Sequence, residues 1–380
     1  MTLAFVTNFV HHHQLPLADE FYRIIGENYH YIATQPLPEW LVKGGYDPSL
    51  DRNYIIRTYH SEDEMQKARR LIDESDVVIA GDSPLIWTLK RKSENRVTFH
   101  NAERWLKKVN IHAVSPRALY NIYTNYFKFR HNRTYMLCAS AFTAQDVHRY
   151  GCFPNRCFKW GYITAVDKSI ETSSWICRPK EYFMLMWCSR FLVWKHPELP
   201  IQLAARLKKK GYNFVIDMFG SGEKLDWASS MAKQYGVDDC VKFCGNRPNQ
   251  EILREMRNHQ IFLFTSDRYE GWGAVLNEAM ANGCVPVASD AIGSAPYLIK
   301  DGENGFLFQS CSLDSLEEKV CALLDDQEKA KSMSNAALDT MQNVWSPRVA
   351  AENFLELAQH ALNGTLNNYT RTEGPASWEK

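Results

Sequence analysis

The sequence predicts an α/β protein with parallel sheets in two domains, and three observations support this prediction. Residues 261–297 alternate between an apolar run, a polar loop, a helix closed by an Asn-Gly pair and a second apolar run. The same alternation starts near Leu3 and restarts near Tyr182. A chain of 380 residues also fits two domains of ordinary size. Sheets of this kind place ligands at the carboxyl ends of their strands.

The first domain is expected over residues 1–165. Its predicted strands are 3–7, 76–80, 97–101 and 135–139, and its predicted helices follow Pro16, span 61–75 and end at Tyr150. Residues 35–55 are rich in Pro, Gly, Asp and Tyr, which predicts a long loop. The polar, aperiodic stretch 165–180 predicts the linker to the next domain.

The second domain is expected over residues 166–344. Its strands are predicted at 182–188, 213–219, 241–244, 261–264 and 285–288, with helices near 198–210, 249–258, 274–281, 313–325 and 328–342. Trp345-Ser346-Pro347 opens a last helix that runs to about residue 362. The polar tail 363–380 is expected to be disordered.

The composition excludes several classes of protein. An apolar content of 45% and a charged content of 23% are typical of a soluble globular protein. Lys plus Arg and Asp plus Glu balance at 44 each, so no global charge favours a nucleic-acid partner. No apolar run is long enough for a membrane-spanning helix, no signal peptide is evident, and no cysteine spacing indicates a metal site. Ten scattered cysteines suggest thiols in a reducing cytoplasm.

Two carboxylates in the 261–297 stretch suit the recognition of hydroxyl groups. Glu270 lies in the loop after the first apolar run, and Glu278 lies on the helix that follows. Free amides at the helix start suit a phosphate, and glycines there allow close approach. These residues are Gly271, Trp272, Gly273, Ala274 and Val275. The arrangement predicts a sugar nucleotide site; a solvated Glu278 with glycines that only form the turn is the alternative.

Two cations follow the strand 182–188 in another loop at the same edge. Arg190 and Lys195 are placed to hold a diphosphate, Arg through its planar fork and Lys as a point charge. Solvated surface cations are the alternative. Further loops at strand ends carry Gly220, Gly222, Asn246 and Arg247.

Residues 270–289, EGWGAVLNEAMANGCVPVAS, resemble the E-x7-E signature of retaining glycosyltransferases with the GT-B fold, in particular glycosyltransferase family 4. The continuations DAIGS (290–294) and DGENGF (301–306) match that family, and KWGY (159–162) resembles the segment where it leaves its first domain. The loop at Arg190 and Lys195 has the family's G-R-x4-K spacing, with Ser189 in place of the glycine. Within that family, the sequence is similar to bacterial glycosyltransferases that make surface polysaccharides.

The resemblance implies two facing Rossmann-like domains with an interdomain cleft, and a last helix, 345–362, that crosses back onto the first domain. It also implies roles for the residues. Glu278 would hold the ribose hydroxyls, Glu270 the hydroxyls of the donor sugar, and Arg190 with Lys195 the pyrophosphate. Gly220, Gly222, Asn246 and Arg247 would lie around the nucleotide. A role for Glu270 as a covalent nucleophile is the alternative. No metal and no cofactor beyond the nucleotide diphosphate sugar are expected.

Histidines in the first domain are candidates for the acceptor side. His100 ends a buried strand in a Thr-Phe-His context that faces the reacting centre in the family, although many strand-end histidines are structural. The resemblance implies a catalytic role, in which His100 would contact the donor sugar or help to orient the acceptor. His11, His12 and His13 replace the glycines that relatives carry after the first strand. Three consecutive histidines cannot all converge on one metal ion. We favour an acceptor-binding or cleft-lining role for them, with a solvated loop as the alternative.

The segment 104–133 interleaves cations with aromatic residues. They are Arg104, Lys107, Lys108, Lys128, Arg130 and Arg133, and Trp105, Tyr120, Tyr123, Tyr126, Phe127 and Phe129. Structural packing of the Tyr120, Tyr123 and Phe127 stripe is one interpretation. Contact with an anionic membrane surface is the other, and nucleic acid is the least favoured.

The sequence therefore predicts a cytoplasmic retaining glycosyltransferase, peripheral on the inner face of the membrane if 104–133 contacts lipid. It would transfer a sugar from a nucleotide diphosphate to a hydroxyl of a saccharide or lipid-linked acceptor, in polysaccharide biosynthesis. The alternatives are a catalytically silent GT-B protein that binds saccharide or nucleotide, and a sugar-nucleotide epimerase.

Overall fold

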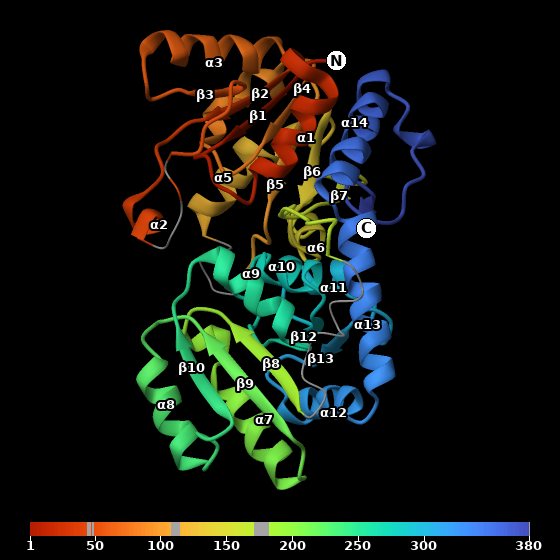
Figure 1. Ribbon diagram of the computed structural model, residues 1–380. Helices are drawn as coiled ribbons and strands as arrows, with labels where there is room; N and C mark the ends of the chain where they lie inside the picture. Colours follow the sequence, from red (N-terminus) through yellow and green to blue (C-terminus); the bar gives the residue numbers. More distant parts are fainter. Residues whose placement is uncertain (44–46, 48, 108–114, 171–181, 380) are drawn as a thin grey trace. The chain divides into compact units, whose positions relative to one another are not determined.

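The computed structural model describes residues 1–43, 47, 49–107, 115–170 and 182–379. The chain divides into two units, unit 1 with Met1–Ala165 and Val344–Lys380 and unit 2 with Val166–Asn343. Most of the predicted linker 165–180 lies outside the described residues. Figure 1 shows helices and parallel strands alternating along the chain in both units.

Unit 1 is built on a sheet that has eight strands in the described part of the chain, in the order β14-β7-β6-β5-β4-β1-β2-β3. All neighbours are parallel except β14 and β7. Apolar runs such as LAFVT in β1 and VVIA in β4 are buried throughout, as expected for strands covered on both faces. The strands are β1 Leu3–Thr7, β2 Tyr29–Ala33, β3 Ile55–Arg57, β4 Val77–Ala80, β5 Thr98–Ala102, β6 Thr134–Cys138, β7 Cys157–Lys159 and β14 Trp378–Glu379.

Helices of unit 1 pack against this sheet. They are α1 Leu15–Ile25, α2 Glu39–Lys43, α3 Glu62–Glu74, α4 Leu89–Ser93, α5 Pro116–Asn125, α6 Thr143–His148 and α14 Pro347–Asn363. Serine side chains cap the starts of α3, α5 and α14 by accepting a backbone amide bond. α14 lies beside α1, where the rings of Phe354 and Phe21 are 5.6 Å apart, so the last helix belongs to unit 1 (Figure 1).

The prediction of a disordered tail after residue 363 is wrong. β14 pairs antiparallel with β7, and Trp378 packs on Phe158 with ring centroids 4.5 Å apart. Tyr369 is buried and donates to the backbone oxygen of Ala376 at 2.9 Å. Two aromatic anchors therefore order a segment whose composition is mostly polar. The long loop expected over 35–55 also differs in part, because α2 forms within it.

Unit 2 is built on a parallel sheet with six strands among the described residues, in the order β10-β9-β8-β11-β12-β13. The strands are β8 Phe183–Cys188, β9 Phe214–Phe219, β10 Val241–Gly245, β11 Ile261–Phe264, β12 Val285–Ser289 and β13 Phe306–Phe308. The helices are α7 Glu198–Lys209, α8 Leu225–Gln234, α9 Asn249–Asn258, α10 Val275–Ala281, α11 Ala295–Leu298, α12 Leu313–Leu324 and α13 Gln327–Asp339.

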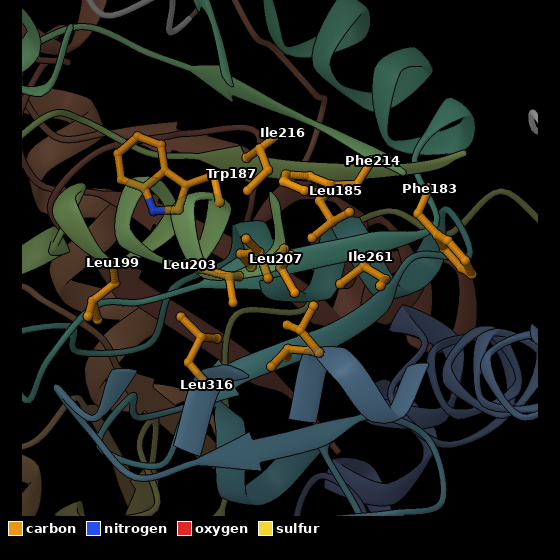
Figure 2. Packing of buried hydrophobic residues seen from close by; sticks show 14 of the residues in the cluster. Phe183, Leu185, Trp187, Leu199, Leu203, Leu207, Phe214, Ile216, Ile261 and Leu316 are labelled. Carbon is orange, nitrogen blue, oxygen red and sulfur yellow. The ribbon is translucent and has the colours of Figure 1, made fainter. Parts of the chain in front are cut away.

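The core of unit 2 lies between its sheet and the helices α7, α8 and α12. Trp187, Leu185 and Ile216 project from the strands toward Leu203 and Leu207 of α7, as Figure 2 shows. Each side chain of this size contributes about 1.5–3 kcal/mol when fully buried. This packing fixes the strands whose carboxyl ends carry the candidate site.

In the described part of the chain, no helix combines the length and the apolar character needed to cross a membrane.

Candidate functional site

The strand order of each sheet identifies where a ligand can bind. In unit 2 the chain leaves β8 toward β9 and β10, then returns to the other side of β8 as β11. In unit 1 the strand order reverses in the same way between β1 and β4. Loops diverge at such a switch point and leave a crevice at the carboxyl ends of the strands. The two switch points are therefore the positions where the fold favours a ligand-binding site.

At the unit 2 switch point, the loops after β8 and β11 are joined by hydrogen bonds. Thr265 Oγ1 donates to the backbone oxygen of Lys195 at 2.7 Å, and the Asp267 amide donates to that of Trp194 at 3.0 Å. Lys195 Nζ pairs with Glu270 Oε2, and Ser266 Oγ donates to the same carboxylate oxygen at 2.9 Å. The side chains of Lys195 and Glu270 are only 9% and 12% exposed, so solvent screens their attraction weakly.

Lys195 carries a charge in a poorly solvated place. Burial lowers the pKa of Lys195, Glu270 raises it by a smaller amount, and the positive charge of Arg190 lowers it. Arg190 itself is exposed. The structure thus brings Arg190, Lys195 and Glu270 to one edge of one sheet, with Lys195 held by a carboxylate and Arg190 turned to solvent.

Gly220 and Gly222 hold the loop that carries Arg190. Gly220 has φ +129°, and a Cβ there would lie 1.9 Å from the backbone oxygen of Ser189. Gly222 has φ +152°, and its Cβ would lie 2.5 Å from the backbone oxygen of Phe191. Only glycine fits both positions, because the two loops touch through their backbones. The structure therefore gives this glycine pair a positioning role in the loop after β8.

Glu278 lies on α10 at the same edge and is held by α9. Asn249 Nδ2 donates to Glu278 Oε1 at 3.0 Å. Burial raises the pKa of Glu278 to about 7, and the bond from Asn249 lowers it by a smaller amount. A carboxyl group with this pKa changes charge near neutral pH, and only its ionised form accepts hydrogen bonds from two hydroxyls with full strength.

If Glu278 holds the ribose hydroxyls, as the family resemblance implies, this pKa predicts a pH dependence of nucleotide binding. The ionised fraction of Glu278 should rise from about 10% at pH 6 to about 90% at pH 8. The affinity for a nucleoside diphosphate, measured by calorimetry, should therefore increase several-fold over that range. A Glu278→Gln variant should lose the part of the increase that Glu278 causes and keep the part due to titration of the nucleotide. An equal pH dependence in both proteins would contradict the role of Glu278.

Ionisation of Glu278 has the opposite effect on the stability of the folded protein. The folded-state pKa of Glu278 lies above the ordinary value of 4.5. Its contribution to folding is therefore fully present below pH 4.5 and is lost as the pH rises through 7.

The other predicted donor-site residues occupy different surroundings. The Trp272 side chain is fully buried and its Nε1 donates to Asn277 Oδ1 at 2.9 Å, so it supports the loop from inside. Gly271, Gly273 and Ala274 lead into Val275, the first residue of α10. Asn246 and Arg247 are exposed in the loop after β10. Contact of these residues with a ligand stays a prediction.

At the unit 1 switch point, a cavity of about 540 Å³ opens. Asn8, His11 and Gln14 come from the segment after β1, Asp82 from the loop after β4, and His100 and Asn101 from β5. Asn8 Nδ2 donates to Asp82 Oδ2 at 3.1 Å, and Tyr162 OH donates to Glu103 Oε1 at 2.7 Å. Polar side chains thus line a hollow in the place where the fold favours a ligand.

The four predicted histidines are only partly brought together. His11 and His100 line this cavity, and the rings of His12 and His13 are tilted against each other with centroids 3.9 Å apart. Burial, and then the charge of His12, lower the pKa of His11 to about 4. Burial, and then Lys92, hold the pKa of His100 well below its ordinary value. Both imidazoles are therefore neutral at physiological pH and can only exchange hydrogen bonds with a ligand.

Among the described residues, no group of three or more His, Cys, Asp or Glu side chains is placed to hold a metal ion.

The segment 104–133 separates into packed and exposed residues. Trp105, Tyr126 and Phe127 belong to a hydrophobic cluster of unit 1, and Arg104 is buried beside Asp146 at 3.6 Å. Tyr120 and Tyr123, by contrast, are 67% and 54% exposed on α5. The packing interpretation is therefore wrong for these two tyrosines. The interpretation of 104–133 as a membrane-contacting surface is wrong for Arg104, because its side chain is buried. Lys108 lies outside the described residues.

Three further residues of the unit 2 site were missed from sequence. Ser266 bonds Glu270, Asn249 bonds Glu278, and His196 joins the loop after β8 to Asp267. Their position at strand ends or helix starts was the available signal, but their partners lie up to 71 residues away in the chain.

Known proteins resemble this chain in sequence and in fold. Residues 173–340 match the family model of glycosyl transferases group 1, which covers most of unit 2. D-inositol 3-phosphate glycosyltransferase of Corynebacterium aurimucosum is 33% identical over 123 residues, 32% of this chain and 29% of that protein. Poly(glycerol-phosphate) alpha-glucosyltransferase of Bacillus subtilis is 24% identical over 198 residues, 52% of this chain and 28% of that protein. The chain thus spans less than a third of these relatives' lengths.

Among solved structures, HepE of Anabaena in complex with UDP is similar with a TM-score of 0.67. The identity is 15%, over 94% of this chain and all of that one. The predicted fold class, a GT-B fold with two Rossmann-like units, is confirmed by this likeness and by the two parallel sheets.

Proposed function

We propose that this protein is a retaining glycosyltransferase that transfers a sugar from a nucleotide diphosphate to a hydroxyl of a saccharide or lipid-linked acceptor. The observation that carries the proposal is the Lys195–Glu270 pair at the switch point of unit 2, inside the segment matched to glycosyl transferases group 1. A buried cation beside a carboxylate, with exposed Arg190 nearby, suits a ligand that has both phosphates and hydroxyls.

In the proposed reaction, the bond between the donor sugar and the diphosphate oxygen breaks. The acceptor hydroxyl attacks the anomeric carbon from the same face, and its proton passes to the leaving diphosphate. Negative charge builds up on the leaving nucleoside diphosphate. Arg190 and Lys195 would stabilise that charge from fixed positions, without reorganisation of solvent at the moment of reaction. Glu270 would orient the sugar hydroxyls and Glu278 the ribose. Metal ions and cofactors have no part in this proposal.

The donor is proposed to be a uridine diphosphate sugar, because HepE was solved with UDP and with UDP-glucose. For the acceptor we propose a saccharide or glycolipid hydroxyl in bacterial glycan biosynthesis. It would bind in the unit 1 cavity, near His11 and His100. The two neutral imidazoles there suit hydroxyl groups better than anions. We further propose a cytoplasmic location, where the described cysteines stay free thiols.

A transfer assay tests the proposal. Purified protein, UDP-glucose and a panel of saccharide acceptors should give an acceptor heavier by one hexose, detected by mass spectrometry. The anomeric signal in NMR should keep the configuration of the donor. Conversion of the UDP-sugar without acceptor would support the epimerase alternative instead. Binding without any turnover of the nucleotide sugars tested would support a silent binding protein.

Membrane contact is a separate proposal, based on Tyr120 and Tyr123. Exposed tyrosines on one helix suit the headgroup region of a lipid surface. Wild-type protein should co-sediment with anionic vesicles at low salt, and a Tyr120→Ser/Tyr123→Ser variant should do so less. A Tyr235→Ser variant, which changes an exposed tyrosine of α8's C-terminal end, is the control. Wild-type protein that stays in the supernatant would remove the proposal.

A further inference from the structure

An exposed cysteine lies beside the unit 2 site and contacts a histidine that also holds the site's loops. Cys311 precedes Ser312, whose side chain caps the start of α12. The Cys311 Sγ atom is 3.5 Å from His196 Nε2. His196 directly follows Lys195 in the chain and is 3.3 Å from Asp267 through the same ring nitrogen.

The other side of the imidazole is oriented by a carboxylate. His196 Nδ1 is 2.6 Å from Glu198 Oε1, in the first turn of α7. The His196 ring thus connects the Cys311 thiol on one side with the Glu198 carboxylate on the other. An arrangement of nucleophile, imidazole and carboxylate of this kind activates thiols in proteins. The bonds to Glu198 and Asp267 raise the pKa of His196, so the ring is positively charged over a wider pH range than a free histidine.

Two features of the structure lie beside the sulfur of Cys311. One is the His196 imidazole, whose Nε2 is within hydrogen-bond range of Sγ. The start of α12, a helix of 12 residues, adds the partial positive charge of its free amides. Contact with solvent lets a reagent reach the sulfur.

The other described cysteines lack this combination. Cys157 also contacts a histidine, His148, at 3.6 Å, but it is fully buried in unit 1. Of the cysteines in the part of the chain that the structure describes, only Cys311 is exposed. Cys311 therefore combines exposure to solvent with a neighbouring imidazole.

We propose that Cys311 is a reactive thiol and a covalent modification site at the edge of the unit 2 sheet, activated by His196 and taking small disulfides as its co-reactant. In the reaction, the Cys311 thiolate attacks one sulfur of the disulfide. A new bond forms between that sulfur and Cys311 Sγ, the old sulfur–sulfur bond breaks, and the other half leaves as a thiolate. The cysteine is oxidised and the leaving half is reduced, so no further reagent is needed.

Modification would also act on the neighbouring site, a consequence that rests on the proposed function. A group on Cys311 occupies the space beside His196 Nε2 and competes with its contact to Asp267. Asp267 belongs to the loop that carries Glu270, and His196 to the loop that carries Lys195. Mixed disulfide formation should therefore lower sugar transfer, and a reducing agent should restore it.

The test measures which cysteine of the folded protein reacts with cystamine at pH 7, by peptide mass mapping over time. A Cys177→Ser background removes the cysteine outside the described residues. Cys311 should react first, roughly tenfold faster than an ordinary exposed thiol. A His196→Asn variant keeps a residue type that tolerates the left-handed backbone of this position, φ 50°, and should lose most of that advantage. Glu198→Gln, which leaves His196 in place, should cause a smaller loss.

Two results would overturn the proposal: a different cysteine reacting first, or an unchanged Cys311 rate in folded His196→Asn. Circular dichroism checks that each variant keeps its secondary structure. Transfer activity before and after reaction, in wild type and Cys311→Ser, is measured separately. Absence of activity in unmodified protein would contradict the proposed function and leave the labelling result intact.

Discussion

Replacing Glu270 by Gln is expected to lower turnover about 10²–10³-fold, the size of effect seen when a fixed polar group of an active site is lost. The Gln side chain keeps an oxygen for Lys195 and Ser266, so the fold should persist. It removes the negative charge that fixes the Lys195 ammonium and that would bind the donor sugar hydroxyls. Initial rates of transfer at saturating donor measure the effect.

Glu303→Gln is the matched control for this substitution. Glu303 is an exposed carboxylate before β13, at the edge of the parallel sheet opposite to the loops of the site. It should keep wild-type turnover. Thermal unfolding should show that both variants are folded. Undiminished turnover in folded Glu270→Gln would contradict the role assigned to Glu270.

Replacing Arg190 by Ala is expected to weaken the binding of a nucleoside diphosphate about 10–100-fold. A hydrogen bond to a charged group contributes about 1.5–3 kcal/mol, and each 1.4 kcal/mol is a factor of ten in Kd. Arg190 is exposed, so its loss leaves no buried charge behind and should cost little stability. Calorimetric titration of UDP into wild type and variant measures the difference.

Two comparisons sharpen the Arg190 experiment. Arg190→Lys keeps the charge but loses the planar fork, so its affinity should lie between those of wild type and Arg190→Ala. Lys209→Ala removes one positive charge at the C-terminal end of α7, away from the strand ends, and should bind UDP as wild type does. Equal affinities of all four proteins would mean that the loop after β8 does not hold the diphosphate.

The alternation of strands and helices was readable from sequence because apolar runs and caps are local signals. The predicted strand 261–264 is β11 with the same ends, and the predicted helix 249–258 is α9. Ser346 and Pro347 marked the start of α14 through a cap and a proline at the first turn. Strand ends also located Arg190, Lys195 and Glu270 in loops, since residues after a buried strand lie at its carboxyl edge.

Pairings between distant residues could not be predicted in this way. The bond from Asn249 to Glu278 depends on how α9 packs beside α10, and no local pattern records that packing. Composition also led to two wrong predictions of side-chain exposure. The polar tail is held by Tyr369 and Trp378, whereas the aromatic stripe of Tyr120 and Tyr123 faces solvent. A single aromatic residue can bury itself only where a partner exists, and the partner is a property of the fold.

The assigned roles of Arg190, Lys195, Glu270 and Glu278 all depend on the proposal that unit 2 binds a nucleotide diphosphate sugar at the switch point between β8 and β11. A thermal-shift titration tests it most directly, with UDP-, GDP-, ADP- and dTDP-sugars and the free nucleoside diphosphates added to the unmodified protein. Bound ligand stabilises the folded state by mass action. At least one of these ligands should therefore raise Tm progressively with concentration, and Arg190→Ala should need more of it for the same shift. An unchanged Tm with every ligand at millimolar concentration would contradict the claim.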